Sequence, residues 1–392
     1  GSIDRIQAVA DRVASVRAQN PHVVVVVSAM GDTTDDLIAM ARRISRTPDP
    51  REYDALISTG ENISAALMSM ALNERGVPAV SLTGPQVRIV TENFYNRAKI
   101  LKVDPARVWE ELNAGKVVVI TGFQGVNERQ DVTTIGRGGS DTSAVVMAAA
   151  LGAPVCEIYT DVDGIYTTDP RIVKTARKLE EISYDEMLEL ASLGAKVLHP
   201  RAVECAKENG VIVHVRSSFN THPGTLVKEA AAMENNRVVT GITLNEEEAK
   251  LSIFRVPDQP GVAGRIFSRL AELNINVDMI VQSVERNHIN NISFTVNQDE
   301  ADQAEATLSA VAKEIGAEGV RVDRSIAKVS IVGVGMISKP GVAARMFTAL
   351  GEQGINLDLI STSEIKVSCV VNRKDGRRAL ETLHRHFGLD VG

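Results

Sequence analysis

The sequence predicts an α/β protein in which a three-layer αβα domain is followed by two smaller ferredoxin-like βαββαβ repeats. Three observations support this prediction. Short apolar strands alternate with helical stretches over the first part of the chain, as in βαβ units. The last third contains an internal duplication, which is typical of repeated domains. Between the two parts the composition changes to Ala, Glu and Asn, which indicates a linker.

The large domain should begin with a helix over Ser2–Ala18, because its apolar residues share one helical face. The valines of Val23–Val27 then predict a strand buried on both faces, as in a parallel sheet. Further strands are expected at Ala79–Leu82, Val117–Thr121, Val155–Thr160 and Val211–Val215, and helices at Asp141–Leu151 and Tyr184–Leu193. We assign residues 1–228 to this domain, 229–245 to a linker with a lead-in strand, and 246–322 and 323–392 to the two repeats.

The two repeats start at Ala249 and Ala327, and each contains a strand, a Pro-Gly turn and an amphipathic helix. Matching positions include Lys250 and Lys328, Pro260 and Pro340, Asn276 and Asn356, and Asp278 and Asp358. The order of elements is that of a βαββαβ unit. Such a sheet leaves one face and an edge free, so we expect the two copies to cover each other.

Charge and composition exclude several classes of protein. The chain has 43 Lys and Arg against 50 Asp and Glu, a net charge of −7, which argues against a nucleic-acid partner. The three cysteines and seven histidines show no metal-ligand spacing, so no protein metal site is expected. No apolar run reaches the roughly 18–20 residues of a membrane helix, and no secretory signal is visible. We therefore expect a cytoplasmic protein without a membrane partner.

A glycine-rich stretch, Thr134–Thr142, lies between a predicted strand and a predicted helix. Its glycines permit positive φ and close backbone approach, and N–H groups at a helix N-terminus favour an anion. Arg137 has the fork geometry to bind a carboxylate or phosphate with two hydrogen bonds. The alternative is a plain turn with Asp141 as the helix cap. The spacing matches neither a P-loop nor a dinucleotide-binding motif.

Three more polar stretches follow predicted strands or begin helices. Tyr159–Arg171 follows a strand, where α/β proteins bind ligands, although a solvated turn is the alternative. Ser28–Thr34 follows the valine strand, and Ser58–Glu61 begins a helix. On its own, Glu61 is more often a helix-start charge than a ligand, and Lys196 is more often a surface cation.

Together these stretches resemble the aspartate kinases of the amino acid kinase family, over essentially the whole chain. The motifs are VSAMGDTTDDL, STGE, TGFQGV, TTIGRGGSDT, YTDVDGIYTTDPR and EMLELASLGAKVLHPRAVE, followed by QPGV, KPGV and ISTSEIKVS. The duplicated half resembles paired ACT domains, which sense amino acids.

The resemblance implies ATP-dependent phosphorylation of the L-aspartate β-carboxylate to 4-phospho-L-aspartate, with Mg²⁺ bridging the ATP phosphates. This reaction is the first step of lysine, threonine and methionine biosynthesis. An ionised carboxylate attacks the γ-phosphorus in line and needs no strong base. Catalysis would then consist of positioning and neutralisation of phosphate charge.

The resemblance also implies site residues. Arg137, Ser140 and Asp141 would be the catalytic residues. Aspartate would be held by Thr34, Glu61, Phe123, Arg137, Gly138, Gly139 and Ser140. The nucleotide side would comprise Ser28, Ser140, Thr160, Asp161, Tyr166, Thr167, Thr168, Asp169, Pro170, Arg171 and Lys196.

Feedback inhibition by lysine, threonine or both is implied as well, with the effector bound between ACT repeats of two subunits. Gly261 and Gly341 would offer N–H groups to the ligand carboxylate, and Asp258 and Asp278 would take its amine. The remaining effector positions would be Ala263, Asn276, Val277, Gln282, Val342, Ala343, Asn356, Leu357, Ser363 and Glu364. The alternative is that the Asn-x-Asp sequences only shape a turn. A homo-oligomer through the ACT repeats is expected, possibly with a shorter regulatory subunit.

One family feature is missing. The family opens with a strand and Lys-Phe-Gly-Gly-Thr-Ser-Val-Gly-Ser, of which Gly1-Ser2 matches only the end, unless these two residues are a cloning remnant. The chain is therefore expected to lack the first strand of its sheet and the motif lysine. Two other interpretations stay open: a related kinase of glutamate or N-acetylglutamate, disfavoured by STGE and the duplicated half, and a non-catalytic amino-acid sensor.

Overall fold

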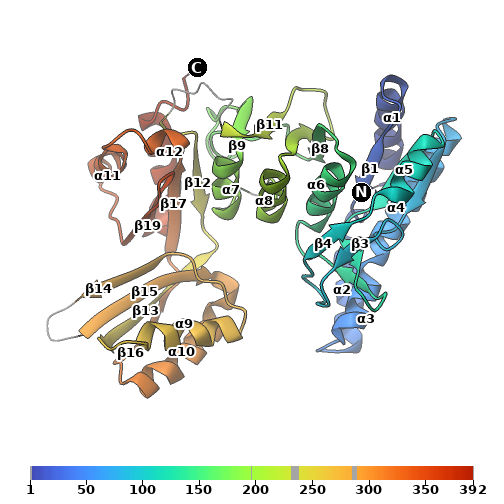
Figure 1. The fold of residues 1–392 in the computed structure, drawn as a ribbon. Helices are drawn as coiled ribbons and strands as arrows, with labels where there is room; N and C mark the ends of the chain where they lie inside the picture. The colour runs from blue at the N-terminus through green and yellow to red at the C-terminus, as the bar shows by residue number, and fades with distance from the viewer. Residues whose placement is uncertain (1, 196, 231–237, 285–288, 392) are drawn as a thin grey trace. The chain divides into compact units, whose positions relative to one another are not determined.

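The computed structural model describes residues 2–195, 197–230, 238–284 and 289–391 (Figure 1). The chain forms two compact units, and each is described by itself. The first comprises Gly1–Ile165, Glu180–Ala191 and Lys196–Ala232, and the second comprises Tyr166–Leu179, Ser192–Ala195 and Met233–Gly392. Part of the predicted nucleotide loop therefore belongs to the second unit.

Parallel strands form the centre of the first unit. One sheet has the order β1 (Val24–Val27), β5 (Val117–Thr121), β2 (Ala79–Leu82), all parallel. A second has the order β8 (Val155–Thr160), β10 (Ile212–Ser217), β11 (Thr225–Lys228), β9 (Glu181–Ser183). A third has the order β4 (Ile100–Val103), β3 (Ile89–Thr91), β6 (Gln124–Val126), β7 (Val132–Thr134). The strands predicted from apolar runs are all present.

Helices cover both faces of the first sheet. On one face α1 (Ile3–Gln19) and α4 (Thr59–Glu74) bury Ala10, Met68 and Leu72 against β5. On the other face α5 (Ala106–Asn113) and α6 (Gly139–Leu151) pack against Val118 and Ile120 of the same strand. This arrangement confirms the three-layer αβα prediction. The other helices are α2 (Thr33–Ile44), α3 (Pro50–Ile57), α7 (Tyr184–Ser192) and α8 (Pro200–Asn209).

The valine strand differs from its prediction. The sequence predicts burial on both faces, but Val23–Val27 are only half-buried. The physical reason is that β1 is an edge strand whose side chains line a cavity.

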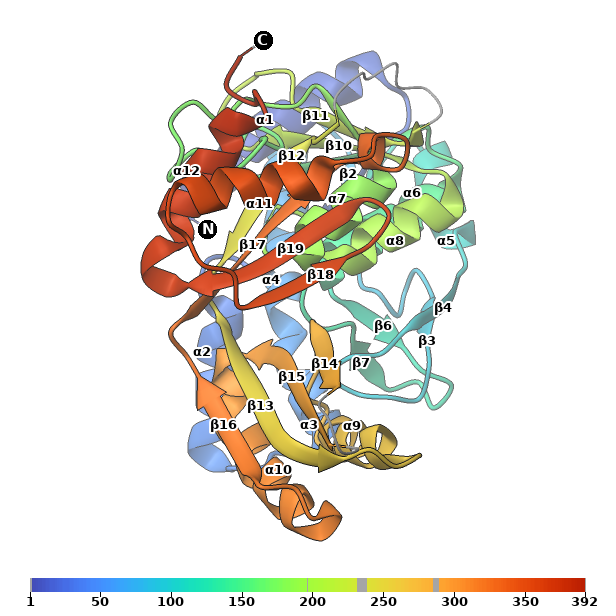
Figure 2. The same cartoon turned by 90° about the vertical axis from the view of Figure 1, so that its left-hand side faces the viewer.

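The first repeat is a complete βαββαβ unit. It comprises β13 (Glu248–Pro257), α9 (Val262–Glu272), β14 (Ile280–Val284), β15 (Ile289–Asn297), α10 (Ala301–Ile315) and β16 (Gly319–Asp323). The strand order is β14-β15-β13-β16, and both helices pack on one face of the sheet (Figure 2).

The second repeat takes its last strand from elsewhere in the chain. It comprises β17 (Ile326–Val332), α11 (Val342–Glu352), β18 (Leu359–Thr362), β19 (Lys366–Asn372) and α12 (Gly376–His386). The sheet order is β12-β17-β19-β18, and β12 (Gly241–Asn245) precedes the first repeat in sequence. The first repeat is thus an insertion into the second, and the strand that we had assigned to the lead-in completes the second sheet. Short 3-10 helices occur at Gln298–Glu300, Val334–Met336 and Arg373–Asp375.

The two repeats contact each other through the strand faces opposite their helices. Met279 and Val281 of the first repeat pack with Ile326, Leu359 and Val370 of the second. The equivalent lysines and aspartates of the duplication pair across this contact: Lys328 binds Asp278, and Lys250 binds Asp358. Lys328 also binds Glu248. This contact agrees with the expectation that the copies cover each other.

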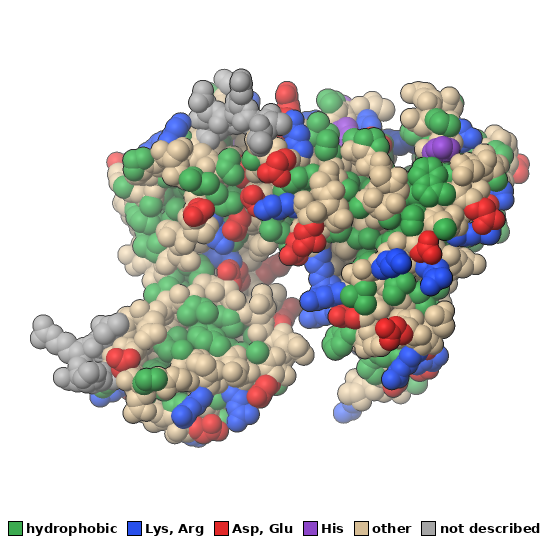
Figure 3. All heavy atoms as spheres, viewed as in Figure 1, with side chains coloured by type: hydrophobic (Ala, Val, Ile, Leu, Met, Phe, Trp, Pro, Cys, Tyr) green, Lys and Arg blue, Asp and Glu red, His purple; other side chains and the backbone are tan. Residues whose placement is uncertain are grey.

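The surface shows both signs of charge. On the face drawn in Figure 3, acidic and basic side chains are interspersed over each unit. Within the described parts of the chain, no helix is both long and apolar enough to cross a membrane. The three cysteines are free, with Cys156 and Cys369 buried and Cys205 half-buried.

Candidate active site

The glycine-rich stretch forms a tight turn from β7 into α6. Gly136 and Gly138 have φ of +86° and +69°. A Cβ on Gly138 would lie 2.1 Å from Cβ of His199, so only glycine fits there. Gly138, rather than Asp141, precedes the first residue of the helix, and Asp141 lies in its first turn. The alternative with Asp141 as the helix cap is therefore wrong in its cap, whereas ligand binding by the turn stays a prediction.

The loop after β5 lies against this turn. Phe123 has a φ of +66°, and its carbonyl accepts a hydrogen bond from the N–H of Ile135 at 2.9 Å. A Cβ on Gly122 would lie 2.7 Å from Oγ of Ser140, and one on Gly139 would lie 2.9 Å from Cδ2 of Phe123. The structure thus brings together the predicted residues Phe123, Gly139 and Ser140.

Arg137 lies in the turn between β7 and α6. Its side chain is exposed and forms no hydrogen bond or ion pair with a described residue. The preceding Ile135 is held by Arg201, whose Nη1 donates to the Ile135 carbonyl at 2.9 Å. The sequence analysis did not identify Arg201, because nothing in its local pattern points to a carbonyl 66 residues away. The guanidinium of Arg137 is free to bind an anion.

Glu61 is a buried carboxylate with one unused oxygen. It lies in the first turn of α4 and is 3% exposed. Its Oε1 accepts the N–H of Ala29 at 3.1 Å, whereas its Oε2 is buried without a partner. Desolvation raises the pKa of Glu61 from 4.5 to about 7. Thr34, in the first turn of α2, follows the same loop and is half-buried.

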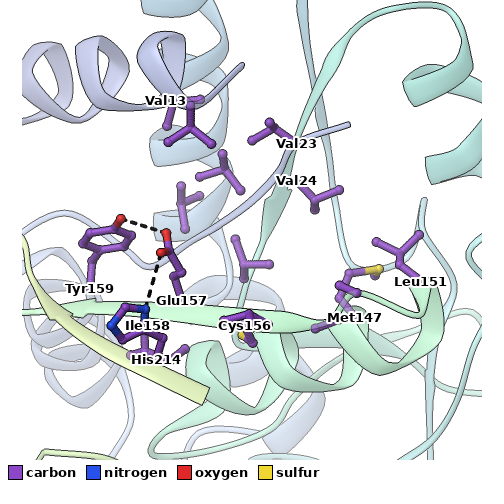
Figure 4. Close-up of a pocket in the computed structure, with 18 of the residues that line it drawn as sticks. Val13, Val23, Val24, Met147, Leu151, Cys156, Glu157, Ile158, Tyr159 and His214 are labelled. Atoms are coloured by element: carbon purple, nitrogen blue, oxygen red, sulfur yellow. Dashed lines mark hydrogen bonds and ion pairs between the residues drawn. The ribbon is translucent and has the colours of Figure 1, made fainter. Parts of the chain in front are cut away.

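A cavity of about 930 Å³ joins several of the predicted residues (Figure 4). It lies between the edge strands β1 and β8 and is lined also by α1 and α6, with Val13, Val24, Met147 and Cys156 among its apolar residues. Ser28, Ser140 and Asp141 line it as well. Desolvation raises the pKa of Asp141.

The predicted nucleotide stretch is divided between the units. Thr160 and Asp161 lie at the carboxyl end of β8 in the first unit, with Oγ1 of Thr160 donating to Oδ1 of Asp161 at 3.1 Å. Tyr166, Thr168, Pro170 and the other residues up to Arg171 belong to the second unit.

Within the second unit this segment is anchored to the second repeat. Thr167 is fully buried, its Oγ1 lies 2.9 Å from Nε2 of His384, and its carbonyl accepts the N–H of Ile242 at 2.8 Å. The guanidinium of Arg171 donates to both carboxylate oxygens of Asp169, at distances that include 2.7 and 3.0 Å, and these contacts lower the pKa of Asp169. Lys196 lies outside the described residues.

The predicted effector residues fall at two ends of each repeat. Asp258, Gly261 and Ala263 lie where β13 meets α9, whereas Asn276, Val277 and Asp278 lie where α9 meets β14. Because β13 and β15 are paired along their length, these ends are separated by about eight residues of strand, or roughly 26 Å. One amine within a single chain therefore cannot contact both Asp258 and Asp278, and their joint role between two subunits stays a prediction. Gln282 lies on β14 between the ends.

The second repeat shows the same division. Val342 and Ala343 begin α11 near the β18–β19 turn that contains Ser363 and Glu364, and Asn356 and Leu357 lie at the opposite end. The Val342 side chain is part of the hydrophobic core of this repeat.

Three comparisons with known proteins agree on the family. Residues 1–217 match the amino acid kinase family, and residues 251–316 and 329–387 each match an ACT domain. The chain is 52% identical to an aspartate kinase of Pseudomonas fluorescens, over 100% of this chain and 95% of that protein. It is 50% identical to an aspartokinase of Thermus thermophilus, over 100% and 96%.

Solved structures give the same result. The crystal structure of E. coli aspartokinase III in complex with aspartate and ADP matches with a TM-score of 0.80 and 26% identity, over 96% of each chain. The same protein with lysine and aspartate matches with a TM-score of 0.75 and 27% identity, over 97% of this chain and 96% of that one. With its kinase domain, its two ACT domains and about half of its residues shared with curated relatives over at least 95% of their length, the chain belongs to the aspartate kinases of the amino acid kinase family.

Proposed function

We propose that the chain transfers the γ-phosphoryl group of ATP to the β-carboxylate of L-aspartate, giving ADP and 4-phospho-L-aspartate in the cytoplasm. The observation that carries this proposal is that the first unit contains both a buried carboxylate with an unused oxygen, Glu61, and an exposed guanidinium without an ion pair among the described residues, Arg137. An amino acid zwitterion supplies the complementary charges, an ammonium and a carboxylate.

The roles follow from these charges. The unused Oε2 of Glu61 takes the α-ammonium group, which supplies the missing hydrogen bond. Arg137 holds a carboxylate of the substrate with two hydrogen bonds. Thr34 and Phe123 flank the bound aspartate in this proposal, and the backbone N–H of Gly138, at the start of α6, faces the anion.

The β-carboxylate of aspartate is the nucleophile. Its ordinary pKa is near 4, so it is ionised at pH 7 and needs no general base. The protein therefore contributes orientation, through Ser140 and Asp141 at the first turn of α6.

Within the first unit, Ser28, Thr160 and Asp161 form the nucleotide side. The roles of Tyr166–Arg171 and Lys196 stay predictions from the resemblance. Within the described residues, no three His, Cys, Asp or Glu side chains gather as a metal site. Phosphate oxygens and waters, which Mg²⁺ prefers, would be its main ligands. When bound, Mg²⁺ neutralises charge on the transferring phosphoryl group.

An ADP-release assay with aspartate, glutamate and N-acetylglutamate tests the proposal. We expect ADP release with aspartate but not with the other two amino acids. Arg137→Ala should abolish the release of ADP with aspartate. Turnover with glutamate or N-acetylglutamate would place the chain with the related kinases. Binding of amino acids without any turnover would support a non-catalytic sensor.

For regulation we propose that lysine, threonine or both bind the Gly261 end of the first repeat, in a homo-oligomer joined through ACT domains. A lysine complex of E. coli aspartokinase III supports an amino acid effector. Gly261 has a φ of +88° and precedes α9, so backbone N–H groups are available for a carboxylate. The effector amine goes to Asp258, which pairs with no cation among the described residues, rather than to Asp278, which Lys328 already holds.

A further inference from the structure

Two buried polar contacts connect the helix start that carries Glu61 to the strand that leads into Arg137. Both contacts lie in the first unit, between α3 with its continuation into α4 and the hairpin of β6 and β7. Neither residue that makes them has an assigned role. The first is Asp54 on α3, which is 0% exposed. The second is Gln124 on β6, which is also buried.

Asp54 accepts hydrogen bonds from two segments that flank the glycine-rich turn. Its Oδ2 accepts the N–H of Thr134 at 2.8 Å and that of Asn96 at 2.9 Å, and its Oδ1 accepts the hydroxyl of Thr134 at 2.7 Å. Thr134 is the last residue of β7, three residues before Arg137. The carbonyl oxygen of Asn96 would lie 3.1 Å from a Cβ on Gly136, so this segment borders the turn itself.

Gln124 connects strand β6 back to the start of α4. Its Nε2 donates to the carbonyl of Ser58 at 2.9 Å and to Oδ1 of Asn62 at 3.1 Å. Ser58 and Asn62 flank Glu61 in sequence, and Gln124 is the register partner of Thr134 in the β6–β7 pair. Asp54, Thr134, Gln124 and the α3–α4 backbone therefore form a closed polar ring.

The charge of Asp54 is not explained by an ion pair. No lysine, arginine or histidine among the described residues pairs with it, and desolvation raises its pKa. A buried carboxylate without a cation is costly. Only a carboxylate, however, offers acceptor sites for all of these donors at once, since an asparagine would present an amide N–H₂ to one of them. The geometry of this contact is thus specified at the expense of stability.

We propose that Asp54, assisted by Gln124, is a positioning residue that fixes the separation of Glu61 and Arg137, and with it the affinity for the amino acid substrate. The inference rests on the proposed roles of Glu61 and Arg137. Asp54 touches no substrate in this account. It acts by holding the end of β7 against α3, so that the two substrate contacts keep one distance.

The test uses two adjacent threonines of β7 as a matched pair. Both are fully buried and both form one side-chain hydrogen bond, Thr134 with Asp54 and Thr133 with Thr91 at 2.6 Å. Thr134→Val removes a bond of the ring, whereas Thr133→Val removes a comparable bond outside it. Asp54→Asn is the stronger change.

We expect Asp54→Asn and Thr134→Val to raise the KM and the calorimetric dissociation constant for aspartate by about ten- to a hundredfold, with the KM for ATP unchanged. Thr133→Val should lower the unfolding midpoint as Thr134→Val does, but leave the aspartate KM unchanged. The double variant Asp54→Asn/Thr134→Val should be non-additive, because both changes break one contact.

Equal effects of Thr133→Val and Thr134→Val on aspartate affinity would overturn the inference, because Asp54 would then only support the fold. An equal loss of aspartate and ATP affinity in Asp54→Asn would overturn it too. If Glu61→Gln and Arg137→Ala also leave aspartate affinity unchanged, the proposed site itself fails. If those two weaken binding and Asp54→Asn does not, the positioning role alone fails.

Discussion

The carboxylates near the candidate active site and those between the ACT repeats differ in whether they have a cation partner. Around the candidate active site, Asp54, Glu61 and Asp141 have no cation partner among the described residues, and desolvation raises the pKa of each. Between the ACT repeats, Glu248 and Asp278 share the ammonium of Lys328, and Asp358 has Lys250.

This difference distinguishes carboxylates that can bind a ligand from carboxylates that hold the two repeats together. A buried carboxylate that already has its cation is part of the structure, and removing the cation leaves an uncompensated charge. A buried carboxylate with a raised pKa and an unused oxygen keeps the capacity to bind a cation from solution. By this criterion we propose Glu61 as a ligand residue, whereas Glu248 is a structural one.

The largest effect is expected at Arg137. Arg137→Ala should lower kcat/KM for aspartate by about 10²- to 10³-fold, because a charge-assisted contact to the substrate carboxylate is lost. Arg129→Ala, an exposed arginine in the β6–β7 turn, is the control and should change little. Steady-state kinetics measure both variants. Equal losses of kcat/KM would show that Arg137 does not bind the substrate.

The pairing between the repeats should show in stability. Lys328→Met leaves Glu248 and Asp278 without a cation and should lower the free energy of unfolding by about 3–5 kcal/mol. The Lys328 side chain is 1% exposed, whereas that of its counterpart Lys250 is 17% exposed and its partner Asp358 is 43% exposed. Lys250→Met should therefore cost only about 0–1 kcal/mol. Urea unfolding of the two variants measures both free energies of unfolding. Similar losses would show that Lys328 and Lys250 contribute equally to the contact between the repeats.

Inhibition should distinguish the two aspartates of the first repeat. Allosteric effectors typically change affinity by about 5- to 150-fold. Asp258→Asn should remove most of the inhibition by lysine and threonine, whereas Asp278→Asn should mainly destabilise the contact between repeats. Initial rates at millimolar effector, singly and together, measure this. Unchanged inhibition in Asp258→Asn would show that Asp258 does not bind the effector amine.

Local patterns allowed much of this to be predicted from the sequence. Apolar runs locate the strands. Gly136, Arg137 and Gly138 are adjacent in the sequence, so an anion-binding turn can be predicted from them without a structure. The duplication identifies Lys250 and Lys328, or Asp278 and Asp358, as equivalent positions.

Long-range pairing was not predictable in the same way. No sequence pattern shows that β12 completes the second repeat, because register across a sheet depends on residues 80 or more positions apart. The ion pair of Lys328 with Asp278 was not predicted for a similar reason, because it joins two repeats that are distant in the sequence. Asp54 was missed because it is one acidic residue in a short amphipathic helix, and only its three-dimensional contacts reveal its importance.

The pKa of Glu61, raised to about 7 from 4.5, makes two pH dependences measurable. The folded state binds this proton more tightly than the unfolded state, so between pH 4.5 and 7 the stability contributed by this group falls as pH rises. In the same range the ionised fraction of Glu61 increases, and only that form attracts the α-ammonium group of aspartate.

The aspartate KM measured from pH 5 to 8, in the enzyme and in Glu61→Gln, tests the central claim most directly. The enzyme should show a KM that falls about tenfold per unit up to a pH near 7 and then levels, as expected for one titrating group. Glu61→Gln should show a raised KM without this slope. A KM that is flat in the enzyme, or an identical slope in Glu61→Gln, would contradict the assignment of Glu61 as the residue that binds the substrate amine.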